Sequence, residues 1–512
     1  MSFAALEIGP TPQTLENLLA LARGTKRPVI SAQTEYRARL AAEQAVVAGA
    51  LARGEAVYGV STGVGASVVN AIDEPHRSDF VSNLFRMLGT GVGAPLAELE
   101  SAAVMAARLV SLASGHSGIR ALVLERMCEL LEARCLPRIP ELGSVGASGD
   151  LAPLSYIAGM LAGEGKVRLR GRVIDATEAL ESLGVEPLEF ELKESLSLVN
   201  GTSFMTGLGA VAWERALDIA KLACAITAMA SEATRGNPRH FDARIAEWKP
   251  HPGQIRAAQW IREHLEYDPA RPLPAPARLQ DRYSIRCAPN VIGVLLDTAE
   301  VARGVLEIEL NGANDNPLVD SETGEILHGG NFYGGHLCSA LDSLKAAVAS
   351  VADLLDRQIA LLVRPDTSDG LPAELVAFEE RGTHAHHGFK GMQVTASALA
   401  AEALKLTMPA AAFSRSTESH NQDKVSMGSI AARDCLRILD LTEAVAAIAL
   451  LAVCQSLDLR GVAPSRASQR LHKAVRKHVP MLRADRRQDA DIACVADLVR
   501  ARTLPLSAPF AS

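Results

Sequence analysis

Residues 143–154 read GSVGASGDLAPL, a run of small residues that leads into a proline-marked helix start. Within it, the backbone of Ala147, Ser148 and Gly149 has room to react with itself. Attack of the Gly149 nitrogen on the Ala147 carbonyl, with loss of two waters, one of them from Ser148, would give a methylidene-imidazolone ring. Glycine suits the attacking position because a Cβ would crowd the strained turn. The stretch therefore predicts either an ordinary glycine-rich loop or an electrophile made from the backbone.

Composition and charge favour a large helical protein and exclude several classes of partner. The chain has 512 residues, of which 48% are hydrophobic and 4% aromatic, a balance that favours close packing of Ala- and Leu-rich helices. Its formal net charge of -7 offers no overall attraction to nucleic acid. The N-terminus lacks a basic and apolar leader, and the apolar run 444–454 is too short to span a membrane. We therefore expect a cytoplasmic protein with neither a nucleic acid nor a membrane as partner.

The residue types that bind metals do not form a recognisable metal site. The 8 cysteines contain no CxxC pair, which is typical of reduced thiols rather than of disulfides or a zinc site. His384, His386 and His387 lie close together, but no carboxylate or cysteine nearby completes a ligand set. The sequence therefore predicts no metal.

The spacing of apolar residues predicts long helices. Between Leu337 and Leu362 apolar residues recur in steps of three and four, which indicates one continuous helix that is buried along one face. Two further long helices are expected over residues 388–406 and 429–459. Helices of this length need partners, so the pattern favours a long antiparallel bundle.

Three shorter segments have local signals. Thr11 and Pro12 are expected to open the first helix, as N-cap and first helical residue, and Gly24 to end it. Residues 166–175 alternate around a glycine, which predicts a small surface hairpin. Residues 267–279 are rich in Pro and Arg and are expected to form a structured loop.

Several motifs outside the first stretch complete a family pattern. They are YGVSTGVG at 58–65, LVNGT at 198–202, QDRYSIR at 280–286, NDNP at 314–317 and GGNFYGG at 329–335. Together with GSVGASGD they make the chain resemble, over nearly its whole length, the histidine, phenylalanine and tyrosine ammonia-lyases and related aminomutases. The resemblance implies a mostly α, fumarase/aspartase-like architecture with small surface β-hairpins. It also implies an N-terminal active-site domain over 1–205, a long central helix bundle with a C-terminal helical layer over 206–512, and a homotetramer.

The same resemblance assigns roles to individual residues. Residues 147–149 would form the 4-methylidene-imidazol-5-one (MIO) group autocatalytically, so that no external cofactor is needed. Tyr58 would remove the β-proton, although an unperturbed phenol titrates near pH 10. Arg286 would clamp the α-carboxylate with its two-pronged guanidinium, and Asn200 would bind the prosthetic group or the substrate amine. Further residues implied around the substrate are Gln280, Tyr283 and Phe332.

Four positions bear on the choice of substrate. Met87 and Leu88 stand where histidine and tyrosine lyases typically have Ser-His, and Gln422 stands where histidine lyases have a glutamate that contacts the imidazole. Lys390, in GFKG, matches the phenylalanine lyases better than the histidine lyases. These differences favour the less polar ring of phenylalanine or tyrosine, because a buried polar group without a partner costs about 1–3 kcal/mol.

Several alternatives stay open on the sequence. The chain resembles histidine ammonia-lyases as well as 2,3-aminomutases, which use the same chemistry but return ammonia to the β-carbon. A charge at Lys390 keeps open a betaine substrate of the ergothioneine type, and a catalytically silent helical assembly protein would keep the fold without the reaction. The expected function is ammonia elimination from an aromatic L-amino acid to give an α,β-unsaturated acid.

Overall fold

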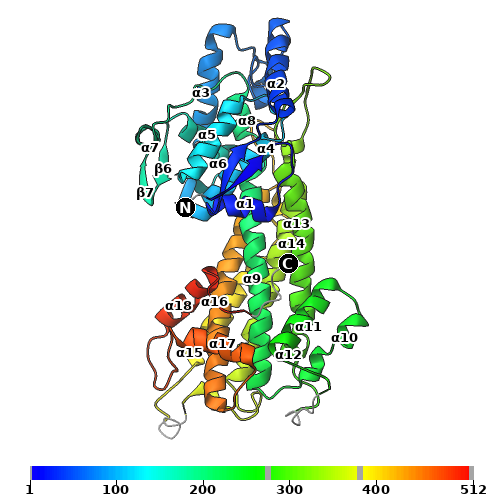
Figure 1. Ribbon diagram of the computed structural model, residues 1–512, viewed down its shortest axis with the longest axis vertical. Helices are drawn as coiled ribbons and strands as arrows, with labels where there is room; N and C mark the ends of the chain where they lie inside the picture. Colours follow the sequence, from blue (N-terminus) through cyan, green and yellow to red (C-terminus); the bar gives the residue numbers. More distant parts are fainter. Residues whose placement is uncertain (1–2, 271–277, 378–383, 507–512) are drawn as a thin grey trace. The chain divides into compact units, whose positions relative to one another are not determined.

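The computed structural model describes residues 3–270, 278–377 and 384–506 and is mostly helical, with 59% helix (Figure 1). The predicted fold class is therefore confirmed. In chain order the helices are α1 (Leu15–Ala22), α2 (Thr34–Ala52), α3 (Arg77–Leu88), α4 (Glu98–Leu112), α5 (Ala121–Glu132), α6 (Leu151–Leu161), α7 (Ala176–Leu183), α8 (Glu194–Val199), α9 (Ser203–Ala233), α10 (Ala243–Glu247), α11 (Pro252–His264), α12 (Tyr283–Arg286), α13 (Ala288–Asn311), α14 (Gly335–Leu362), α15 (Lys390–Lys405), α16 (Gly428–Arg460), α17 (Arg466–Arg476) and α18 (Asp489–Arg500).

The chain divides into two compact units, each assembled from separate stretches of sequence. Unit 1 comprises Met1–Ala212, Ala302–Asp342 and Pro409–Arg433. Unit 2 comprises Trp213–Val301, Ser343–Met408 and Asp434–Ser512. The expected division into a site domain over 1–205 and a bundle over 206–512 stays a prediction.

Small sheets in unit 1 connect its helices. The strands are β1 (Ala4–Ile8) and β2 (Lys26–Ile30), which pair in parallel with Ala4 opposite Lys26; β3 (Val92–Pro95) and β5 (Pro140–Leu142), antiparallel; β4 (Cys135–Pro137), β6 (Lys166–Leu169) and β7 (Arg172–Asp175), in one antiparallel sheet; and β8 (Leu318–Asp320) and β9 (Glu325–Leu327), antiparallel. The predicted hairpin over 166–175 is confirmed as β6 and β7. The other strands are three to five residues long, too short to show a clear alternating pattern.

The first helix begins later than the sequence indicated. Thr14 is the N-cap, because its hydroxyl accepts the Asn17 N–H at 3.3 Å, and helix α1 starts at Leu15. Thr11 and Pro12 precede it. The Gln13 N–H donates to the Asn311 side chain at 2.6 Å, so a contact distant in sequence fixes the chain just before the helix. Gly24, at φ +69°, follows the helix end as expected.

The long predicted helices are confirmed as α14, α15 and α16, each within two residues of its expected ends. In unit 2 the long helices α9, α13, α14 and α16 pack side by side (Figure 1). The Trp213 indole N–H of α9 donates to the Ala299 carbonyl of α13 at 3.0 Å, and Gln358 of α14 donates to Thr227 of α9 at 2.8 Å. Both bonds are buried, so these polar groups fix the register of the helices.

Four further observations bear on the sequence predictions. All eight cysteines lie in the described part of the chain, and none is in a disulfide. Across the described ranges, no cluster of three or more His, Cys, Asp or Glu side chains could hold a metal ion. No helix in those same ranges is long and apolar enough to cross a membrane. Residues 271–277 of the loop expected over 267–279 lie outside the described residues.

Candidate active site

The tripeptide at 147–149 lies in a backbone turn that only small residues permit. Ser148 and Gly149 both have left-handed φ angles, of +51° and +73°. A Cβ added to Gly149 would lie 2.1 Å from the Gly201 carbonyl oxygen, so this position excludes every other residue. The same carbonyl accepts the Asp150 N–H at 2.8 Å. The sequence prediction of a strained, glycine-dependent turn therefore matches the geometry of the loop.

Asp150 fastens this turn to the following helices. Its carboxylate is fully buried and accepts the Ser144 hydroxyl and the Met205 N–H, both at 2.9 Å. Burial raises the pKa of Asp150 to about 7, against the lowering effect of these two hydrogen bonds. The carboxylate thus joins the loop before α6 to the first turn of α9, next to the tripeptide.

Asn200 and Gly201, at the end of α8, pack against the turn from the other side. A Cβ on Gly201 would lie 2.3 Å from the Arg108 guanidinium and 2.6 Å from the Asn314 amide oxygen, so this glycine too is required. Asn200 is 3% exposed, and its Oδ1 has no hydrogen-bond partner among the described residues. A buried acceptor without a partner is costly. The predicted role of Asn200, to bind the prosthetic group or the substrate amine, stays a prediction.

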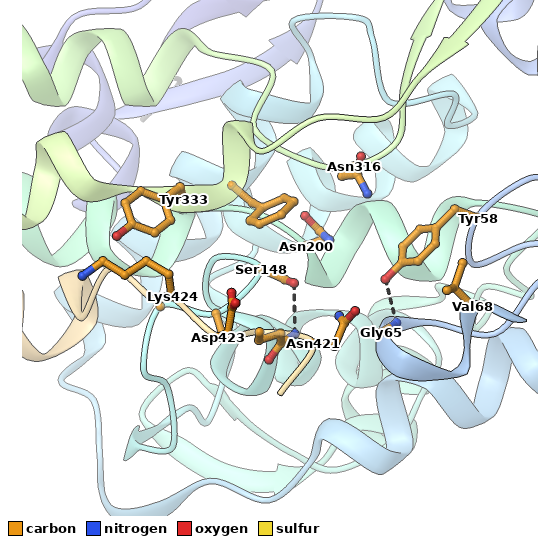
Figure 2. Close-up of a pocket in the computed structure, with 14 residues that line it drawn as sticks. Tyr58, Gly65, Val68, Ser148, Asn200, Asn316, Tyr333, Asn421, Asp423 and Lys424 are labelled. Carbon is orange, nitrogen blue, oxygen red and sulfur yellow. Dashed lines mark hydrogen bonds between the residues drawn. The ribbon is translucent and has the colours of Figure 1, made fainter. Parts of the chain in front are cut away.

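Tyr58 points its hydroxyl at the backbone of the glycine-rich loop that follows it. The Gly65 N–H donates to the Tyr58 oxygen at 2.8 Å, as Figure 2 shows, and the His328 ring meets the Tyr58 ring edge-on at 6.5 Å between centroids. Burial raises the pKa of Tyr58, the Gly65 hydrogen bond lowers it, and the charge of Glu418 raises it. The net direction is upward from the ordinary phenol pKa near 10, so the free Tyr58 phenol is protonated at neutral pH.

The loop that contains Gln422 closes the site. The Gln422 amide donates to the Ser148 hydroxyl at 3.1 Å, a bond drawn in Figure 2 as the dashed line that starts at Ser148. Thr417 and Gln422 pair with each other through backbone hydrogen bonds, so the residues between them form a tight loop. Within that loop, the Glu418 carboxylate accepts the Ala66 N–H at 3.0 Å.

Two adjoining cavities in unit 1 share the central residues, which are Tyr58, Gly65, Ser148, Asn200 and Gln422. The smaller, about 280 Å³, has a mixed lining and is called the polar cavity because its lining is more polar than that of the larger one. It is completed by Asn316, Phe332, Tyr333, Asn421, Asp423 and Lys424, among others (Figure 2). The larger, about 670 Å³, is mostly apolar and is completed by Ile72, Phe80, Leu84, Met87, Leu88 and Leu196, among others. Such a division suits a substrate with a polar end and a ring.

The structure brings most of the predicted site residues together in these cavities. Residues of the tripeptide, Tyr58, Asn200, Phe332 and Gln422 line the polar cavity, and Met87 and Leu88 line the apolar one. Gly149 packs directly behind them, against Gly201. Their roles in catalysis and binding stay predictions.

The other predicted residues belong to unit 2. Tyr283 and Arg286 bound the short helix α12, and the Arg286 guanidinium lies 4.7 Å from the centroid of the Tyr283 ring. The Arg286 Nε donates to the Asp281 carbonyl at 3.0 Å, while Tyr283 is 71% exposed. Gln280 is also exposed, and Lys390 is the first residue of α15. Their predicted part in substrate binding stays a prediction.

Two residues that the sequence did not single out contact the site. Glu418 accepts the Ala66 N–H, and the His328 ring meets the Tyr58 ring; both residues lie hundreds of positions away in the sequence. No local pattern predicts such contacts, because neither residue stands in a motif whose chemistry requires an acid or an imidazole.

Comparison with known proteins identifies the family. The profile described as aromatic amino acid lyase matches residues 13–477. The chain belongs to the aromatic amino acid lyase family. A histidine ammonia-lyase from Koribacter versatilis is 38% identical, over 94% of this chain and 95% of its own. An MIO-dependent tyrosine 2,3-aminomutase from Streptomyces globisporus is 39% identical, over 92% of this chain and 91% of its own.

The solved structures agree with the family. The crystal structure of histidine ammonia-lyase from Trypanosoma cruzi has a TM-score of 0.89 to this chain, with 34% identity and coverage of 99% of this chain and 96% of that one. This aromatic amino acid lyase is therefore a carbon–nitrogen lyase, as predicted.

Proposed function

We propose that this aromatic amino acid lyase eliminates ammonia from an aromatic L-amino acid and leaves an α,β-unsaturated acid. The observation that carries the proposal is that Tyr58, Ser148 and Asn200 line one cavity, with the strained tripeptide on its wall. A proton acceptor, a precursor of an electrophile and an unpartnered amide oxygen are the groups that such an elimination requires.

The residues around the tripeptide fit an MIO group. Gly149 has no Cβ to oppose ring closure, the Ser148 hydroxyl faces the cavity as the group that is eliminated, and the Asn200 oxygen has no other partner there. When formed, the group supplies an electrophilic carbon for the substrate amine. The Streptomyces globisporus aminomutase, which is MIO-dependent, supports the assignment.

The chain's own residues would divide the work as follows. The Tyr58 phenolate accepts the β-proton, and the Gly65 N–H stabilises the phenolate by a hydrogen bond. The Asn200 oxygen accepts a hydrogen bond from the substrate amine. The apolar cavity around Leu88 excludes water from the ring, and the guanidinium of Arg286 binds the carboxylate.

Histidine is the first substrate to test. Relatives that are 38% and 39% identical over more than nine-tenths of this chain are histidine ammonia-lyases, and they do not confirm the expected preference for phenylalanine or tyrosine. The second candidate, a less polar ring, is favoured by the apolar residues that line the larger cavity, among them Met87 and Leu88. A panel of histidine, tyrosine and phenylalanine, read by ammonia and by the absorbance of the unsaturated acid, separates the two candidates.

Substitutions in the cavity test the substrate choice. We expect Leu88→His to raise kcat/KM for tyrosine relative to phenylalanine about 10-fold, because the new imidazole offers the phenol a hydrogen-bond partner. Gln422→Glu is expected to raise the preference for histidine, since a carboxylate can pair with an imidazolium. If neither change alters the ratios among the three substrates, the ring does not occupy the apolar cavity.

The same reaction centre suits two related outcomes. A 2,3-aminomutase would return the amine to the β-carbon, as the name of the Streptomyces globisporus relative indicates for that protein. Product analysis by mass separation of β-amino acid from unsaturated acid distinguishes the two. If the substrate is instead an ergothioneine-type betaine, the reaction should release trimethylamine. If the protein is a catalytically silent assembly protein, both turnover and the near-UV band of the MIO ring should be absent.

We further propose that the enzyme is a homotetramer whose sites combine residues of different subunits. Helix α13 exposes Val294, Val301 and Ile308, which recur every seven residues, with 59%, 67% and 75% of their surfaces accessible. An exposed apolar stripe of this kind favours association with another helix. The exposed Tyr283, just before α13, would then be covered by a second copy.

Hybrid oligomers test the sharing of sites. Tyr58→Phe and Arg286→Ala are each expected to be nearly inactive as pure proteins. When the two variants are co-expressed, random mixing should restore about a quarter of the wild-type activity if the two residues of one site come from different chains. Activity per subunit is measured after tandem affinity purification of the mixed oligomers. A mixture that stays inactive would show that both residues act within one chain.

A further inference from the structure

We propose that Glu418 is a positioning residue for Tyr58: its carboxylate holds the loop over 59–70 so that the Gly65 N–H meets the Tyr58 hydroxyl. The inference rests on the proposed role of Tyr58 as base, and it deepens that role by naming what fixes the base.

Consecutive peptide groups connect Glu418 to the phenol. The Glu418 carboxylate accepts the Ala66 N–H at 3.0 and 3.2 Å, one distance for each oxygen. The preceding peptide N–H, that of Gly65, donates to the Tyr58 oxygen at 2.8 Å. Because the two N–H groups belong to adjacent residues of one turn, a partner that places the first also places the second.

Gly65 leaves the space that this contact needs. A Cβ on Gly65 would lie 2.5 Å from a carboxylate oxygen of Glu418, closer than any real contact. Gly65 also has a left-handed φ of +59°. The carboxylate therefore reaches the backbone only because this position has no side chain.

Glu418 itself lies in a second loop, over 417–422, and the other end of this second loop contacts the tripeptide. Thr417 and Gln422 close the loop by backbone hydrogen bonds of 3.0 and 3.3 Å, and the Gln422 amide donates to the Ser148 hydroxyl at 3.1 Å. One short loop thus contacts the base through Glu418 and the precursor of the electrophile through Gln422. The loop sets how the two reacting groups lie relative to each other.

The backbone of the loop over 417–422 is strained at Glu418 and at the two residues that follow it. Glu418, Ser419 and His420 have successive φ angles of +48°, +54° and +62°, a region that residues other than glycine rarely adopt. Such conformations persist where neighbouring contacts enforce them, often at functional sites. Here the Ser416 hydroxyl and the His420 Nδ1, 2.7 Å apart, provide one such contact.

Glu418 acts on the phenol in two opposite directions. Its negative charge raises the pKa of Tyr58, whereas the Gly65 N–H that it positions lowers that pKa. Besides Glu418, His328 meets the edge of the Tyr58 ring, and Asp423 and Lys424 line the same polar cavity as Tyr58. A glutamine at 418 would keep an acceptor for the Ala66 N–H without the charge, and an alanine would remove both.

The test compares Glu418→Gln with Glu418→Ala, with Glu181→Gln on the exposed face of α7 as a control for loss of one carboxylate. In Glu418→Gln the rising limb of the kcat profile should move to lower pH by a few tenths of a unit to about one unit. In Glu418→Ala kcat should fall about 10-fold or more with a smaller change in KM. Hydrogen exchange of the peptide over 63–67 should speed up in the alanine variant, and stay near wild type in the glutamine variant.

Two results would overturn the proposal. Unchanged exchange over 63–67 in Glu418→Ala would show that the carboxylate does not hold the loop. A loss of kcat in Glu418→Gln as large as in Glu418→Ala would show that the carboxylate acts on the substrate itself. Exchange is measured without turnover, so it is independent of the proposed reaction. Full activity in Tyr58→Phe would instead refute Tyr58 as the base and leave the exchange result intact.

Discussion

Ser148→Ala is expected to lower kcat by on the order of 10³-fold or more, because the alanine has no hydroxyl to eliminate and the electrophile cannot form. The variant should also lack the near-UV absorbance of the MIO ring. Both quantities are measured on the purified protein, by difference spectroscopy and by ammonia release with the best substrate of the panel.

Folding should survive this change. Ser148 contributes one hydrogen bond, from Gln422, and alanine in its left-handed conformation is strained by about 1 kcal/mol. Circular dichroism and size-exclusion profiles should therefore match the parent, as should those of the control Ser182→Ala, which removes a hydroxyl from α7. Undiminished turnover in Ser148→Ala would disprove the proposed function as a whole.

Tyr58→Phe is expected to lower kcat by about 10²–10⁴-fold, the usual contribution of a positioned general base. The near-UV band should stay intact, since the phenol takes no part in forming the ring. In the parent enzyme kcat should keep rising with pH from neutrality to above pH 10, because burial raises the pKa of Tyr58 above that of an ordinary phenol and the deprotonated form is the active one. The variant should lose this rising limb.

A second tyrosine provides the matched control. Tyr333 lines the polar cavity beside Lys424, yet the structure gives its hydroxyl no part in the contacts of the Tyr58 loop. Tyr333→Phe should keep the rising limb of the pH profile that Tyr58→Phe loses. Wild-type kcat in Tyr58→Phe would exclude Tyr58 as the base.

The sequence predicted the long helices well because their signal is local and repeated. The steps of three and four from Leu337 to Leu362 define α14 almost to its ends. Likewise, the small residues at 146–149 indicate a tight turn, and the structure shows that the Gly201 carbonyl leaves no room for a Cβ at position 149. Burial on one helix face and steric exclusion in a turn both leave a trace in neighbouring residues.

Contacts between distant segments left no such trace. Helix α1 begins later than predicted because the side chain of Asn311, nearly three hundred residues away, binds the Gln13 N–H. The contact of Glu418 could not be predicted because its partner is the backbone N–H of Ala66, and almost every residue has such a group. Substrate preference was the hardest to predict, since it depends on which side chains share a cavity with Leu88 rather than on any one position.

Because unit 1 is assembled from three separate stretches of sequence, its pocket is completed late during synthesis of the chain. Gly201, whose carbonyl packs against Gly149 and accepts the Asp150 N–H, lies in the first stretch of the unit. Gln422, which contacts Ser148, lies in the last stretch, which ends at Arg433. The pocket wall is therefore complete only after the ribosome has released the chain beyond Gln422, well after Gly201. A partly synthesised chain carries residues 147–149 before Gln422 exists to contact Ser148, so the surroundings of the tripeptide are complete only once the last stretch of unit 1 has been made.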